Sequence, residues 1–138
     1  PVFTYARVNE ESIELKSYVY NPNCIVVFDM GLEELGIDIY EGAQPGCIMA
    51  VNASSGLTID KENITKVVTV NAEGLTNQIN EEIPFNSAML GVLAKGTGCV
   101  SIESLETVIK SKISGKAGEQ NAEACRRAYE EAAIYEKV

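Results

Sequence analysis

Three short apolar runs lie in the first half of the chain, and each has the length of a buried strand. They cover residues 24–29 (CIVVFD), 47–52 (CIMAVN) and 66–71 (KVVTVN). Continuous apolar runs of this kind are typical of strands that are covered on both faces of a parallel sheet. Turn-forming residues precede the first two runs, at positions 21–23 and 42–46. We therefore predict three parallel strands.

Residues 2–8 alternate in a way that predicts one more strand. One side would carry Val2, Thr4, Ala6 and Val8, and the other Phe3, Tyr5 and Arg7. Alternation with a period of two places successive side chains on opposite faces of a strand. We expect this segment to lie at an edge of the sheet.

Helical patterns lie between and after the strands. Residues 30–42 predict one or two short helical turns, and residues 72–82 predict a helix that Pro84 stops, because proline cannot continue a helix. From Asn86 onward the pattern is helical. Strands separated by helices predict an α/β fold, a three-layer sandwich with a mainly parallel, Rossmann-like sheet and a helical C-terminal third.

The helix that begins near Asn86 is apolar on nearly every face. Its apolar residues are Ala88, Met89, Leu90, Val92, Leu93 and Ala94. Such a helix must be covered by other protein rather than by water, and we expect apolar helical surfaces to be buried against sister subunits. Asn86 is the expected N-cap, and Gly96 and Gly98 are expected to end the helix, because glycine accepts left-handed backbone at little cost.

Two further helices are expected after that turn. Ser101 is the expected N-cap of a helix that Gly115 ends, and residues 116–137 form the closing helix. The closing helix carries a narrow stripe of mostly small residues, namely Ala122, Cys125, Tyr129, Ala132 and Ala133. This stripe favours close packing over a cofactor role. Arg126 and Arg127 could face an anionic partner or simply form a solvated helix surface.

Composition narrows the class of protein. The chain has 138 residues, of which 46% are hydrophobic, which suits one domain with a sizeable core. The net charge of −9, with only 11 Lys and Arg residues, argues against a nucleic-acid surface. No apolar run approaches the roughly 18 residues of a membrane span and nothing resembles a secretory signal, so we expect a cytoplasmic protein without membrane contact.

Cysteine and histidine usage limits the chemistry further. Cys24, Cys47, Cys99 and Cys125 lie far apart without a C-x-x-C pair, which favours reduced thiols over disulfide, zinc or iron–sulfur ligands. The chain has no histidine, which excludes Ser-His and Cys-His nucleophile pairs. No carboxylate pair suggests an acid and a base. We expect neither a catalytic residue nor a metal site in this chain.

Candidate binding residues follow the predicted strands, at the edge where open parallel sheets bind ligands. Asn52, Ser54, Ser55 and Gly56 could offer an amide, hydroxyls and backbone N–H groups to a phosphate or to a neighbouring subunit. The alternative is a turn in which these groups satisfy their own backbone. Asp29 could bind a ribose, but capping a helix is the simpler interpretation.

Several motifs, taken in order, carry a resemblance to a known family. Asn86, Met89, Leu90, Gly91 and Leu93 fit a helix of the pattern Asn-x-x-Met-Leu-Gly-x-Leu, and residues 101–106 read Ser-Ile-Glu-Ser-Leu-Glu. Further matching runs are residues 5–13, 24–29, 41–54 and 115–130. In this combination the chain resembles the gamma subunit, or gamma domain, of the 2-oxoacid:ferredoxin oxidoreductases, the group of pyruvate synthase and 2-oxoglutarate synthase.

The resemblance implies a role in coenzyme A-dependent oxidative decarboxylation of a 2-oxoacid, with ferredoxin taking the electrons. It implies alpha, beta and delta partners in a hetero-oligomer. Thiamine diphosphate would be held by alpha and beta, and iron–sulfur clusters by delta and, in most members, beta. The gamma part would be a non-catalytic assembly domain that binds no cofactor itself and helps to frame the approach of coenzyme A. The substrate could be pyruvate, 2-oxoglutarate or a branched 2-oxoacid.

Gamma subunits of that family open with a Gly-rich strand-turn-helix unit, and no G-x-G-x-x-G occurs here. The resemblance thus implies that residues 1–138 are a single gamma-type domain that is N-terminally incomplete. An alternative function is a self-standing nucleotide- or coenzyme A-binding α/β module that uses residues 52–56 as its anion site. A third is an oligomeric scaffold without a ligand.

Overall fold

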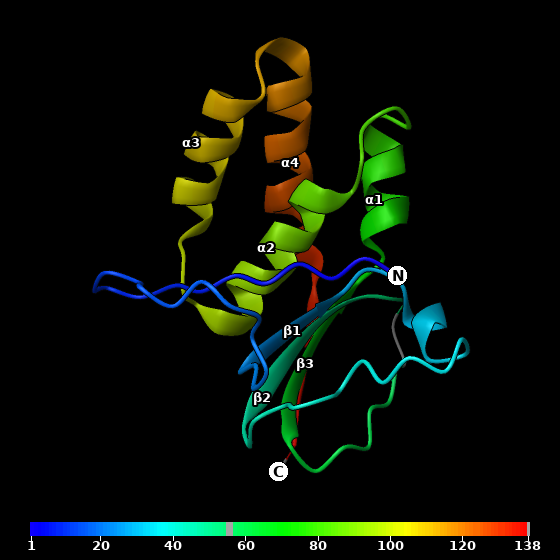
Figure 1. The fold of residues 1–138 in the computed structure, drawn as a ribbon. Coiled ribbons are helices and arrows are strands. Elements are labelled where there is room, and N and C mark those ends of the chain that lie inside the picture. The colour runs from blue at the N-terminus through cyan, green and yellow to red at the C-terminus, as the bar shows by residue number, and fades with distance from the viewer. Residues whose placement is uncertain (55–56, 138) are drawn as a thin grey trace.

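The computed structural model describes residues 1–54 and 57–137, in which four strands form one sheet (Figure 1). The strands are β1 (Cys24–Val27), β2 (Cys47–Asn52), β3 (Ile64–Val70) and β4 (Ala133–Glu136). The helices are the short 3-10 helix η1 (Met30–Leu32), α1 (Ala72–Ile79), α2 (Asn86–Thr97), α3 (Ile102–Lys112) and α4 (Gly115–Glu131).

The sheet is mainly parallel, as predicted. β1, β2 and β3 run parallel in the order of the sequence, and β4 pairs with β3 in the antiparallel direction. In register, Val26 lies beside Ala50, Ala50 beside Val68, and Val68 beside Ile134. The α/β fold class and the three strands predicted from the apolar runs are confirmed.

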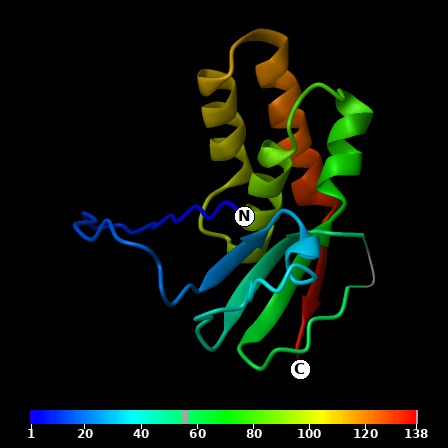
Figure 2. The same cartoon turned by 45° about the vertical axis from the view of Figure 1, so that its right-hand side comes forward.

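Helices cover one face of the sheet, and η1 with two loops covers the other (Figure 2). On the helical face, Ala50 and Val68 belong to one core cluster with Met89 of α2 and Ala124 of α4. Much of the apolar surface of α2 is therefore covered by this chain's own sheet and helices, whereas Leu90 is 39% exposed. The cluster on the opposite face includes Val27, Ile39, Met49, Val51, Ile59 and Val67.

The end of the chain differs from the prediction. The closing helix, predicted over residues 116–137, ends as α4 at Glu131, and residues 133–136 form β4 instead. Ala132 has extended backbone, with φ −63° and ψ 137°. Without β4, the outer backbone groups of β3 would lack hydrogen-bond partners, and Ile134 and Tyr135 are residue types that favour strands.

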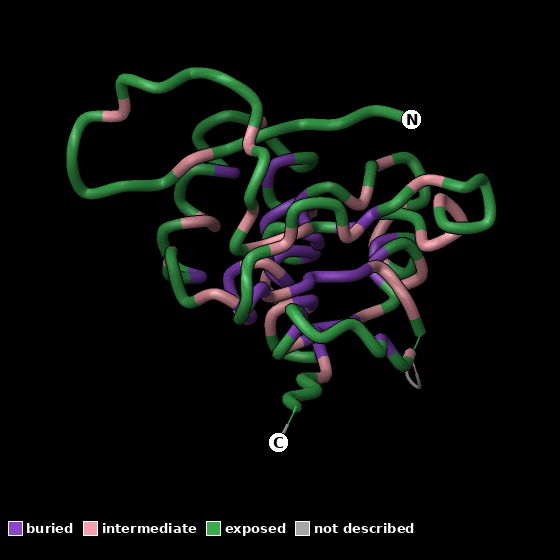
Figure 3. Tube along the Cα trace, turned by 60° about the horizontal axis from the view of Figure 1, so that its bottom comes forward, coloured by how far each residue is buried: buried purple, intermediate pink, exposed green. Residues whose placement is uncertain are grey.

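The strand predicted over residues 2–8 is wrong. Residues 1–23 form neither helix nor strand, although the side chains alternate along them. A strand needs a neighbouring backbone to pair with, and the described chain offers none here. Figure 3 shows most of this segment as exposed tube that projects away from the buried centre.

The expectation that residues 24–29 are covered on both faces is also wrong, because Val26 is 37% exposed at the sheet edge.

Several helix ends also differ from the predicted ones. Asn86 is the first residue of α2 and not its N-cap, which is Phe85. The ring of Phe85 contacts that of Phe28 in a tilted arrangement, with 5.5 Å between ring centroids. Gly98 closes α2 with φ 64°, as predicted, whereas Gly96, which the sequence also predicts to end the helix, lies buried within it. Gly115 does not end α3 but starts α4, with φ 68°, because α3 already stops at Lys112.

The first helix after β3 ends before the proline predicted to stop it. α1 stops at Ile79, and its C-cap Asn80 has extended backbone. The Asn80 side chain donates to Gln120 Oε1 at 3.0 Å and accepts from the Glu82 backbone N–H at 2.9 Å. These two hydrogen bonds turn the chain away from the helix four residues ahead of Pro84.

Helices α2 and α4 pack closely where the backbone of α2 approaches that of α4 at Gly91. A Cβ added at Gly91 of α2 would sit 2.1 Å from the carbonyl oxygen of Cys125 in α4. Since real Cβ atoms do not approach backbone oxygen this closely, only glycine fits at this position. The absent side chain therefore sets the distance between the two helices.

We expect Gly91→Ala to lower the free energy of unfolding by about 3 kcal/mol, because the new methyl group must push α2 and α4 apart. Helix propensity alone predicts the opposite sign, a gain of about 1 kcal/mol. Urea unfolding followed by circular dichroism measures the difference. Gly96→Ala is the control, because its Cβ would meet only the Val68 and Ile48 methyl groups, at 3.0 and 3.2 Å, and a smaller loss is expected.

Candidate functional site

The carboxyl ends of β1, β2 and β3 meet at one edge of the sheet, where the sequence predicts binding residues. Asn52, at the end of β2, donates from Nδ2 to the Phe28 carbonyl at 3.0 Å. Its Oδ1 accepts from the Ala72 backbone N–H at 2.9 Å. Asn52 thus joins the end of β1 to the start of α1, and both ends of its amide are engaged within the chain.

The other polar side chains at this edge cap the elements that follow them. Asp29 Oδ1 accepts from the Gly31 N–H at 2.8 Å, which confirms it as the N-cap of η1. Asn71 Oδ1 accepts from the Gly74 N–H at 2.9 Å and caps α1. The structure therefore brings Asp29, Asn52 and Asn71 to the same edge, and it gives each of them a backbone partner of its own.

The predicted binding segment is only partly described. Ser54, two residues after Asn52, is exposed, whereas Ser55 and Gly56 lie outside the described residues. The interpretation of this segment as a ligand site stays a prediction.

Replacing Asn52 tests its role in joining these elements. We expect Asn52→Ala to lower the free energy of unfolding by about 2 kcal/mol, because the Ala72 N–H and the Phe28 carbonyl lose their partner. Asn52→Asp keeps the acceptor for Ala72 and loses the donor, so its loss should be smaller. Asn77→Ala, at an exposed position of α1, should change stability by less than about 0.5 kcal/mol. Thermal unfolding of the three variants measures the order.

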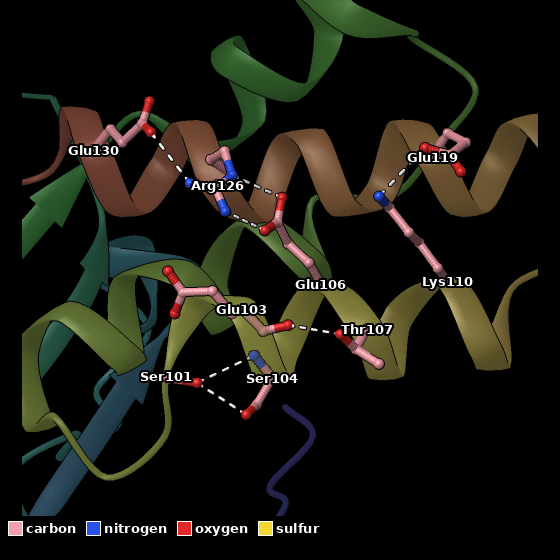
Figure 4. Close-up of polar contacts among 9 residues, drawn as sticks. All are labelled: Ser101, Glu103, Ser104, Glu106, Thr107, Lys110, Glu119, Arg126 and Glu130. Atoms are coloured by element: carbon pink, nitrogen blue, oxygen red, sulfur yellow. Dashed lines mark hydrogen bonds and ion pairs between the residues drawn. The ribbon is translucent and has the colours of Figure 1, made fainter.

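A second polar cluster joins α3 to α4 (Figure 4). The Arg126 guanidinium forms a two-pronged ion pair with the Glu106 carboxylate, with Nε 2.7 Å from Oε1, and it lies 3.6 Å from Glu130. Lys110 Nζ lies 3.5 Å from Glu119 Oε2 farther along the same two helices. The sequence left two roles open for Arg126, an anionic partner or a solvated helix surface. In the structure its guanidinium instead pairs with carboxylates of this chain, Glu106 and Glu130.

Charge and capping fix the start of α3 as the sequence predicts. Ser101 Oγ accepts from the Ser104 N–H at 3.1 Å, so Ser101 is confirmed as the N-cap.

The hydrogen bond from Arg126 lowers the pKa of the Glu106 carboxyl. Sequence reasoning missed Glu106 as the partner of Arg126, because 20 residues separate them and their pairing depends on how α3 packs on α4.

The ion pair predicts a pH dependence of stability. Because the folded-state pKa of Glu106 is lowered, its stabilising contribution is present above the ordinary carboxyl pKa of about 4.3 and is lost as the pH falls through the lowered value. Glu106→Gln should therefore be less stable than the wild type at neutral pH, and this difference should shrink below about pH 4. Glu103→Gln, one turn earlier and without this ion pair, should show a much smaller difference. Unfolding midpoints measured against pH give both.

The cysteines differ in exposure: Cys47 and Cys125 are buried, Cys24 is half-buried and Cys99 is exposed. Burial raises the pKa of the Cys24 thiol to about 12 and that of Cys125 to about 11, so both are protonated at neutral pH. Within residues 1–54 and 57–137, no three His, Cys, Asp or Glu side chains come together as a metal site would require. None of the helices described is both long enough and apolar enough to cross a bilayer.

Comparison with known proteins gives consistent matches. Residues 1–131 match the family model described as pyruvate ferredoxin/flavodoxin oxidoreductase. The chain is 38% identical to pyruvate synthase subunit PorC of Methanothermobacter marburgensis, over 94% of this chain and 71% of that one. It is 36% identical to the common gamma subunit of the pyruvate/ketoisovalerate oxidoreductases of Pyrococcus abyssi, over 99% of this chain and 75% of that one.

A solved structure has the same fold. It is the crystal structure of pyruvate oxidoreductase subunit PORC from Thermotoga maritima, with a TM-score of 0.73 and 30% sequence identity. The match covers 86% of this chain and 67% of that one.

Proposed function

Because the chain belongs to the pyruvate ferredoxin/flavodoxin oxidoreductase family, we propose that it is the gamma subunit of a 2-oxoacid:ferredoxin oxidoreductase complex. The observation that carries this proposal is the family match over residues 1–131, with the gamma-type relatives at 36–38% identity. In this proposal, residues 1–138 act as one gamma-type domain. It has the role of an assembly subunit beside alpha, beta and delta partners.

The chemistry of the reaction belongs to groups that the sister subunits hold. Thiamine diphosphate supplies the carbanion chemistry, iron–sulfur clusters carry the electrons to ferredoxin, and coenzyme A accepts the acyl group. The residues of this chain suit none of these tasks well. It has no histidine, and its buried thiols have raised pKa values that oppose the thiolate form an iron–sulfur cluster requires.

The substrate is proposed as pyruvate or a related 2-oxoacid. One relative is named as a pyruvate synthase subunit, and another is named as common to pyruvate and ketoisovalerate oxidoreductases. A gamma subunit that serves two substrates does not select between them. We therefore expect substrate choice to depend on the sister subunits and not on this chain.

Co-purification tests the proposal. A tagged form of the chain, isolated without oxygen from its native cells, should bring down partners with the visible absorbance of iron–sulfur clusters and with bound thiamine diphosphate. The isolated complex should oxidise a 2-oxoacid with coenzyme A and ferredoxin, and the chain alone should not. A lone monomer that binds a nucleotide would contradict the proposal and favour the nucleotide- or coenzyme A-binding module. The engaged amide of Asn52 gives that alternative no support.

A further inference from the structure

We draw no further inference here: the strongest candidate, the pair of thiols formed by the half-buried Cys24 at the start of β1 and the exposed Cys99 in the turn between α2 and α3, carries nothing, because only the raised pKa of Cys24 connects the two side chains and both are free cysteines in the part of the chain that the structure describes.

Discussion

The close approach of α2 to α4 is the constraint on which the rest of the structure depends. Gly91 leaves room for the Cys125 carbonyl on one side of α2, and Gly96 lies against Val68 of the sheet on another. With α2 held between the sheet and α4, the position of α4 is fixed relative to β3. α4 in turn carries the ion-paired α3 and delivers β4 to the outer edge of β3. Two glycines therefore set the spacing of most of the C-terminal half.

This packing buries most of α2 within the chain itself. α2, the most apolar helix, is covered by β2, β3 and α4 of the same chain. The Cys24 and Cys125 thiols are poor nucleophiles, because desolvation disfavours their charged form. Val26 of β1 stays 37% exposed at the outer edge of the sheet.

Local patterns in the sequence predicted local structure well. The apolar runs located β1, β2 and β3, and the caps at Asp29, Gly98 and Ser101 followed from the chemistry of single residues. Features decided by distant parts of the chain were missed.

The misses have physical causes. Residues 133–136 continue a helical pattern, and they become β4 because β3 has an open edge. The alternation in residues 2–8 is real, but periodicity does not reveal whether a neighbouring strand exists. At the candidate site, the position of Asn52 followed from the strand before it. Its bridge from Phe28 to Ala72 could not be predicted, because 24 and 20 residues separate it from these partners.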